Sequence, residues 1–115
     1  FDKNAFYKEF LRLLSEKGLS VDEAFQGITI EKDTVKKILK GKYYPTKNLI
    51  FSLSLKNGFD LDETNRLLGC SFLSFDFVKA KDVVVYYLLK EKVENPELIF
   101  EALEEYKIDG LFLEK

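Results

Sequence analysis

The stretch LSVDEAFQGITIEKDTVKKILKGKYYPTKNLI, residues 19–50, is typical of two short helices, a turn and a proline-marked step into a third helix. Ser20 and Glu23 stand three residues apart, as in a capping box. There, the serine oxygen and the glutamate carboxylate each accept a hydrogen bond from a free backbone N–H group at the start of a helix. The pattern predicts a short helix over residues 21–26 that buries Ala24 and Phe25.

A second helix is predicted over residues 31–40, because Val35, Ile38 and Leu39 recur at the spacing of one helical face. Gly41 suits the left-handed conformation that often ends a helix, and Pro45 fits just before or at the start of the next one. Helices in this order are typical of helix-turn-helix domains, which favours nucleic-acid binding. The same packing also serves in protein-interaction modules, so both interpretations stay open.

The segments on either side of this stretch also have helical patterns. Residues 4–17 place apolar side chains on one helical face. Residues 46–57 are apolar on most sides, which predicts the central helix of the core. The alternation in LIFSLSL also resembles a strand, but Thr46 as a cap and Gly58 as a stop favour a helix. Residues 60–68 open with a second capping-box pattern and are predicted to form a further short helix.

The second half of the chain is predicted to form a pair of helices. Residues 76–92 carry an apolar stripe, although the run VVVYYLL within them also has strand propensity. Asn95 followed by Pro96 is a strong helix start. The chain end, residues 111–113, is expected to return to the core. The stripe of the first helix comprises Phe77, Ala80, Val84, Tyr87 and Leu88, broadened by Val83 and Val85. The expected buried face of the second comprises Leu98, Ile99, Ala102, Leu103 and Tyr106.

These patterns predict an all-α fold of about six helices in a single domain, residues 1–115. It consists of a helix-turn-helix-like unit over residues 5–68 and a C-terminal helical extension over residues 76–113. With 115 residues and 46% apolar content, the chain can build one core but not two. No apolar run approaches the 18 residues that a membrane span needs. The absence of any Met leads us to expect missing leading residues or a longer parent chain.

The chemistry-bearing residues argue against catalysis. The chain has no His, a single Cys and no glycine-rich phosphate loop, which removes the common nucleophile pairs and zinc sets. Asp60 and Glu63 are explained by capping, and Cys70 is expected to be a small buried residue. We therefore expect no enzyme, no catalytic residue, no metal and no cofactor. One cysteine also suits reducing, cytoplasmic surroundings.

Charge is unevenly distributed although the net charge is only −2. Lysines dominate residues 31–56, whereas glutamates dominate the chain from residue 91 onward. Side chains of the predicted second helix and its flanks would contact DNA phosphates, with Thr34 nearest the bases. Glu31 and Asp33 in the first turn of that helix would be repelled by phosphate. The predicted DNA-binding residues are Lys32, Thr34, Lys36, Lys37, Lys40, Lys42 and Lys47.

The order of these signals resembles Cro/repressor-like (XRE-type) helix-turn-helix domains over residues 5–68. A closer resemblance, over nearly the whole chain, is to small bacterial helix-turn-helix-like proteins and C-terminal modules, some attached to macro (ADP-ribose-binding) domains. It implies a helical fold more firmly than an activity. The chain differs from that group at residues 31–33 and at Cys70-Ser71-Phe72. The motifs that carry the resemblance are Tyr43-Tyr44-Pro45-Thr46-Lys47, Phe59-Asp60-Leu61-Asp62-Glu63, Leu67-Leu68, Asp82 before VVVYYLL, and Glu101-Ala102-Leu103.

Two functional hypotheses follow. The first is a non-enzymatic transcription regulator that binds DNA through its lysine-rich face, as a dimer on a palindromic site. The alternative is a protein-interaction or oligomerisation module of a larger bacterial assembly. In that case the basic side chains of one copy, Lys36, Lys37 and Lys40, would meet the acidic side chains of its neighbour, Glu97, Glu101 and Glu105.

Overall fold

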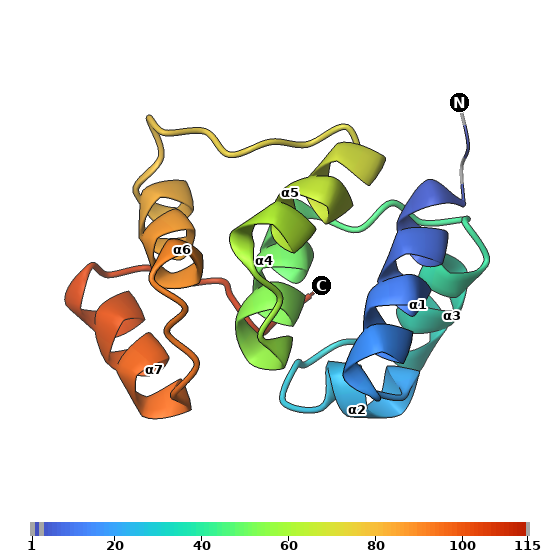
Figure 1. Ribbon diagram of the computed structural model, residues 1–115, viewed down its shortest axis with the longest axis horizontal. Coiled ribbons are helices and arrows are strands. Elements are labelled where there is room, and N and C mark those ends of the chain that lie inside the picture. Colours follow the sequence, from blue (N-terminus) through green and yellow to red (C-terminus); the bar gives the residue numbers. More distant parts are fainter. Residues whose placement is uncertain (1, 3, 115) are drawn as a thin grey trace.

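The computed structural model describes residue 2 and residues 4–114, which form seven α-helices and no strand (Figure 1). The predicted all-α class is confirmed, with a helix count close to the expected six. The helices are α1 (Ala5–Lys17), α2 (Val21–Phe25), α3 (Lys32–Leu39), α4 (Lys47–Asn57), α5 (Leu61–Cys70), α6 (Ala80–Lys90) and α7 (Pro96–Glu105). None of these helices is both long and apolar enough to cross a membrane.

Several helices begin at side-chain caps that the sequence predicted. The Ser20 hydroxyl accepts from the Glu23 N–H at 3.1 Å, and the Glu23 carboxylate accepts from the Ser20 N–H at 3.0 Å. Asp60 and Glu63 form the same reciprocal pair at the start of α5, with both distances 2.8 Å. The predicted capping boxes are therefore both confirmed. Gly58 ends α4 in the left-handed conformation, with φ 69°.

Helix α4 lies at the centre of the core, with α1, α2 and α3 on one side and α6 and α7 on the other (Figure 1). Every residue from Leu49 to Leu55 is buried, including Ser52 and Ser54. Their hydroxyls are satisfied: Ser52 donates to the Asn48 carbonyl, and Ser54 accepts from Thr64. The prediction of a central helix here is confirmed, and it explains why no single apolar stripe marks this segment.

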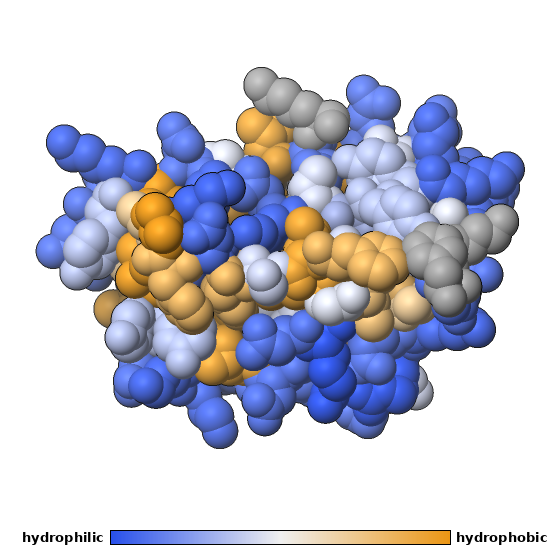
Figure 2. Space-filling view, turned by 90° about the horizontal axis from the view of Figure 1, so that it is seen from above, coloured by the Kyte–Doolittle hydropathy of each residue, from blue (hydrophilic) through white to orange (hydrophobic). Residues whose placement is uncertain are grey.

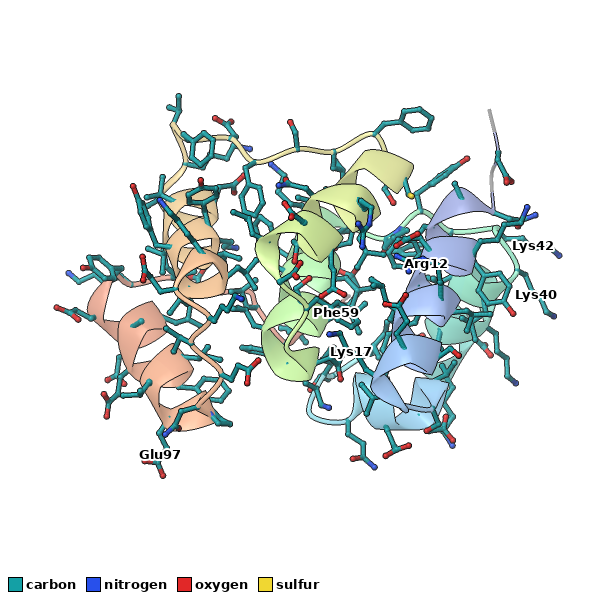
Figure 3. All side chains as sticks on the ribbon, viewed as in Figure 1. Arg12, Lys17, Lys40, Lys42, Phe59 and Glu97 are labelled. Atoms are coloured by element: carbon teal, nitrogen blue, oxygen red, sulfur yellow. The ribbon has the colours of Figure 1, made fainter. Side chains whose placement is uncertain are left out.

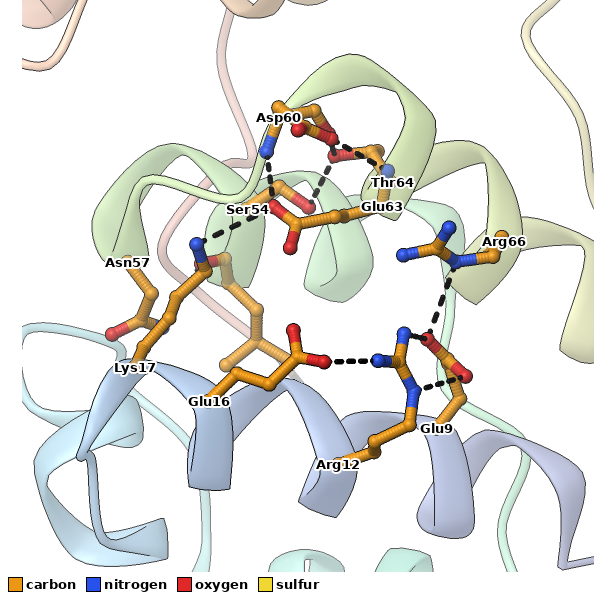
Figure 4. A network of polar contacts seen from close by, with 11 residues as sticks. Glu9, Arg12, Glu16, Lys17, Ser54, Asn57, Asp60, Glu63, Thr64 and Arg66 are labelled. Carbon is orange, nitrogen blue, oxygen red and sulfur yellow. Dashed lines mark hydrogen bonds and ion pairs between the residues drawn. The ribbon is translucent and has the colours of Figure 1, made fainter.

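A network of charged side chains holds α1 against α5 (Figure 4). The Glu9 carboxylate accepts from both Arg12 and Arg66, and Arg12 also pairs with Glu16. Hydrogen bonding from Arg12 lowers the pKa of Glu9 below its ordinary value. At the other end of α1, the Lys17 ammonium lies 3.4 Å from the Glu63 carboxylate. Carboxylates and cationic side chains thus pair along the length of the contact between α1 and α5.

Helix α6 begins later than predicted, at Ala80 instead of residue 76. The four preceding residues form a turn in which the Asp76 carboxylate accepts from the Val78 N–H and the Asp76 carbonyl accepts from the Lys79 N–H. Phe77 therefore lies outside the helix and is 60% exposed. The run with strand propensity is helical, because Val85, Leu88 and Leu89 bury the face that meets the core.

The expected apolar faces of the last two helices are wrong in part. On α6, Ala80 and Tyr87 are exposed, but Val85 and Leu88 are buried, so only part of the predicted stripe packs on the core. On α7, Ile99 and Leu103 are buried as expected, but Leu98 is 52% and Tyr106 59% exposed. One edge of the apolar stripe of α7 is therefore left at the surface.

The end of the chain returns to the core, as predicted. The Thr29 N–H donates to the Phe112 carbonyl, and the Glu114 N–H donates to the Thr29 carbonyl, both at 2.8 Å. The Phe112 N–H donates to the Ser52 hydroxyl at 2.8 Å. The Phe112 ring packs on Phe100 of α7, with ring centroids 5.2 Å apart. These contacts tie the C-terminal segment to the loop before α3 and to α4.

Candidate nucleic-acid interface

Helix α3 is anchored by one side and exposes the other. Ile38 is only 1% exposed, and Val35 and Leu39 are half-buried against the core. Because an α-helix turns about 100° per residue, this anchoring directs the remaining positions toward solvent. Gly41, with φ 68°, ends the helix and turns the chain. The exposed lysines of the helix and the turn, here called the basic face, are Lys32, Lys36, Lys37, Lys40 and Lys42.

The lysines of the basic face are distinguished by lying together on one helix and the turn after it. Across the part of the chain that the structure describes, none of its five lysines forms an ion pair. Several lysines elsewhere are engaged: Lys8 and Lys17 pair with carboxylates, and Lys56 donates to the Glu23 carbonyl at 2.9 Å. Lys40 and Lys42 extend from the right-hand end of the molecule in Figure 3. The basic face therefore keeps its charge free for an external anion.

Lys47, predicted to belong to this face, is not brought together with it. Its ammonium lies 2.9 Å from the Asp82 carboxylate, which has only 3% side-chain exposure, and Lys47 itself retains 22%. The same carboxylate oxygen accepts from the Asp76 N–H at 2.7 Å. Lys47 therefore links the start of α4 to the start of α6. Two motifs quoted for the bacterial resemblance, around Lys47 and at Asp82, meet in this ion pair.

Two side chains in the first turn of α3 affect what the face can bind. Thr34, expected to lie nearest the bases, is half-buried beside Ile38 and is thus at the edge of the basic face. Asp33 is exposed and lies among the lysines. Glu31, just before the helix, makes no side-chain cap. A phosphate approaching this turn would meet two carboxylates as well as the lysine charges.

Acidic side chains gather at the opposite end of the molecule. Four glutamates of α7 are exposed, and Glu97 lies at the far end of the long axis from Lys40 and Lys42 (Figure 3). The protein extends 36 Å along this axis. No cluster of three or more potential metal ligands occurs among the described residues. The acidic glutamates are Glu97, Glu101, Glu104 and Glu105.

Cys70 and Tyr43 carry reactive groups, but both lie in packed surroundings that raise their pKa values. Burial raises the pKa of the Cys70 thiol, and the nearby Glu9 charge adds to this effect. Burial also raises the pKa of Tyr43, assisted by Glu114, whose carboxylate accepts from the Tyr43 hydroxyl at 3.3 Å. The same carboxylate accepts from the Thr46 hydroxyl at 2.7 Å. Both shifts hold the group in its neutral form, which suits packing.

One feature was missed by the sequence analysis: an apolar groove of about 560 Å³ between α6 and α7. The available signal was the apolar stripe of α6, which was assigned to the core. Ala80, Val84 and Tyr87 of that stripe line the groove. Leu88 lines it too, but is also buried in the core beside Val85 and Leu89. A sequence pattern reports that a face is apolar but not what covers it.

Comparison with known proteins gives no further assignment. No protein-family model matches the chain, and neither a curated protein nor a solved structure shows significant similarity to it. The resemblance to helix-turn-helix proteins therefore stays a prediction.

Proposed function

We propose that this protein binds DNA through the basic face, using the α2–α3 unit as a helix-turn-helix. The observation that carries the proposal is the gathering of five exposed lysines on α3 and the turn after it, none with an ion-pair partner among the described residues. Lysines placed in this way release condensed counterions when they contact phosphates, and this release supplies most non-specific DNA affinity. The order of α1 to α5 and the capping box of α2 support the helix-turn-helix interpretation.

The acidic net charge does not oppose this proposal. The glutamates of α7 lie at the other end of a 36 Å molecule. At physiological ionic strength the Debye length is about 8 Å, so the two ends act almost independently on a ligand. DNA at the basic face would experience the lysines together with Glu31 and Asp33, and little of the distant acidic helix.

The mode of binding is expected to favour the phosphate backbone over base edges. A recognition helix reads bases with its first turn, where this chain offers Thr34 beside two carboxylates. Five lysines on one small domain also give limited affinity, in the range of roughly 1–100 µM for non-specific sites. Tighter binding would require two copies on one duplex, which places α3 of each copy in successive major grooves.

The test is fluorescence anisotropy with a random-sequence duplex between low and moderate salt. Replacing Lys36, Lys37 and Lys40 by Ala should reduce the log–log salt slope by up to about 2.7, at about 0.9 per lost phosphate contact. The fold should be unchanged, because these side chains have no charged partner within the described chain. The matched control replaces Lys79, Lys90 and Lys92, which are equally exposed but lie at the other end. If the wild type does not bind at low salt, or if both variants lose binding equally, the proposal fails.

A second candidate function is head-to-tail association between copies. It is favoured by the placement of the basic face and the α7 glutamates at opposite ends of the long axis (Figure 3). Contacts of this kind generate rings or filaments when they repeat. Size-exclusion chromatography with light scattering should then show assembly at low salt that is lost at high salt. Replacing Glu97, Glu101 and Glu105 by Gln would abolish such assembly but leave DNA binding intact.

A further inference from the structure

The groove between α6 and α7 has walls that are almost entirely apolar. Its α6 wall repeats at intervals of three and four residues, so it follows one face of that helix over its whole length. Val93, in the connection between the two helices, also lines the groove, and Glu91 lies at the C-terminal end of its α6 wall. The α6 side is lined by Ala80, Val83, Val84, Tyr87 and Leu88, and the α7 side by Ala102 and Tyr106.

The rim of the groove exposes large hydrophobic side chains. Tyr87 is 54%, Tyr106 59% and Val78 94% exposed, and Leu98 lies one helical turn before Ala102 with 52% exposure. Figure 2 shows a band of apolar residues on the face that carries the connection into α6. Contiguous exposed apolar surface of this kind is rare on monomeric proteins and marks interaction sites.

The shape of the groove suits a helix better than a compact small molecule. Its α6 wall extends from Ala80 to Glu91, which corresponds to about 16 Å at 1.5 Å per residue. Two neighbouring helices leave between them a furrow in which a third helix packs ridge into groove. Peptides recognised in this way present apolar anchors at i, i+3 or i+4, and i+7. About three turns of helix would fill the length of the furrow.

Charges around the groove determine which helix it would accept. Glu91 lines the groove, and Glu101 and Glu105 border Ala102 on the exposed side of α7. The outer edge of α6 carries Lys90, whose ammonium lies 5.7 Å above the Tyr87 ring. A second copy of this chain whose α7 entered the groove would place Glu101 and Glu105 of both copies around one interface, where like charges repel. The acidic edge is instead complementary to a basic partner.

We propose that the α6–α7 groove binds an amphipathic helix of a partner protein, whose apolar stripe is edged by Lys or Arg on the side facing α7. The apolar stripe would cover Val84, Tyr87 and Leu98, and the basic edge would pair with Glu101 and Glu105. The site shares no residue with the basic face, so the protein would be able to hold DNA at one end and a basic helix at the other.

The probe is a synthetic 18-residue helix of Leu and Ala with Lys along one edge of the leucine stripe, and its twin carries Glu in place of Lys. Binding is measured by fluorescence anisotropy and located by amide chemical shifts. The Lys peptide should bind and shift α6 and α7 resonances, and the Glu peptide should bind at least about tenfold more weakly. Equal binding of the twins would overturn the charge argument, and shifts outside α6 and α7 would overturn the site.

Variants of the groove give the decisive comparison. Tyr87→Ser should weaken the Lys peptide by about tenfold or more, as truncation of a central aromatic anchor does. Phe100→Ser is the matched control, because Phe100 is equally exposed on α7 but packs on Phe112 away from the groove. Charge reversal at Glu101 and Glu105 to Lys should exchange the preference between the twin peptides. These variants alter exposed side chains, and thermal unfolding by circular dichroism verifies that each one folds.

Other occupants would appear as distinct results. If the wild type alone dimerises in light scattering and Tyr87→Ser abolishes the dimer, a second copy occupies the groove and the proposal is wrong. If neither peptide binds at millimolar concentration, the groove is not a helix site. The variant that replaces Lys36, Lys37 and Lys40 by Ala should retain peptide binding. A failure of the groove proposal can therefore be distinguished from a failure of the DNA-binding proposal.

Discussion

The ion pair between Lys47 and Asp82 offers the most direct test of how the two halves of the chain are joined. Asp82 is buried at the start of α6 and accepts from the Lys47 ammonium and from the Asp76 N–H. Lys47→Met would leave the carboxylate buried with only its backbone donor. Removing one partner of a buried pair costs about 3–5 kcal/mol. We expect about 2–3 kcal/mol, because the remaining N–H bond and the partial exposure of the Lys47 site reduce the penalty.

A double-mutant cycle isolates the pair from these side effects. Asp82→Asn should cost about 1–2 kcal/mol, since the amide oxygen still accepts from the Asp76 N–H while Lys47 turns toward water. In the double variant neither charge remains, so the two losses should not add. A coupling energy of about 1–2 kcal/mol is expected between residues in direct contact. Urea unfolding followed by circular dichroism measures each variant, with an unchanged m-value as the sign that only stability differs.

An exposed pair at the start of α1 supplies the control for this cycle. The Lys8 ammonium lies 3.0 Å from the Asp2 carboxylate, but the two side chains are 69% and 48% exposed. Exposed pairs of this kind contribute little, so the Lys8→Met and Asp2→Asn cycle should show no measurable coupling. The reasoning is refuted if the Lys47–Asp82 cycle is additive within experimental error. Lys47 would then be free in solution, and its predicted place among the DNA-contacting lysines would be restored.

Two further predictions concern single carboxylates. Asp33→Asn removes a negative charge from among the lysines of the basic face and should tighten binding to random duplex DNA by up to about fivefold at low salt. Unit charges about 4 Å apart interact by about 1 kcal/mol in water. Asp62→Asn, at an exposed position on α5, is the control in anisotropy titrations, and equal effects of the two would contradict the proposed face. Glu9 has a pKa below its ordinary value of 4.5 because Arg12 and Arg66 favour the carboxylate. The stabilisation that the Glu9 carboxylate provides is fully present above pH 4.5, and it is lost as the pH falls through the lowered pKa. Glu9→Gln should therefore lower the urea midpoint of unfolding at pH 7 and make that midpoint fall less steeply between pH 7 and pH 3. If the midpoint of the variant falls as steeply toward low pH as that of the wild type, the network is not formed in solution.

The helix starts were predictable because their causes lie within three or four residues. A capping box at Ser20 or Asp60 is formed by side chains and N–H groups of one turn, so the local pattern is enough. The start of α6 was not predictable in this way. The Asp76 N–H donates to the Asp82 carboxylate, which also accepts from Lys47, 35 residues earlier in the chain. These long-range contacts hold the turn that precedes the helix, so the helix begins at Ala80 and Phe77 lies outside it.

The candidate site also has parts that depend on neighbouring residues and parts that depend on residues distant in the sequence. The exposure of Lys36, Lys37 and Lys40 follows from the burial of Ile38 on the same helix, and was therefore predictable from α3 alone. The position of Lys47 depends on Asp82, 35 residues further along the chain, which no local pattern reports. For α6, amphipathicity correctly identified an apolar stripe, but only the packed structure shows that part of it, at Ala80 and Tyr87, is left uncovered.

The arrangement of the molecule makes its two proposed surfaces separable by experiment. The basic face belongs to α3 and the turn after it, whereas the groove belongs to α6 and α7, and the central α4 lies between them (Figure 1). Exposed substitutions on one surface should therefore leave the other unchanged. The Lys47–Asp82 pair is different, because it joins the segment that follows the basic face to the helix that forms one wall of the groove. If weakening this pair alters DNA binding and peptide binding together, the two surfaces communicate through the junction of α4 and α6. If it lowers stability alone, the pair only supports the fold and the surfaces act independently.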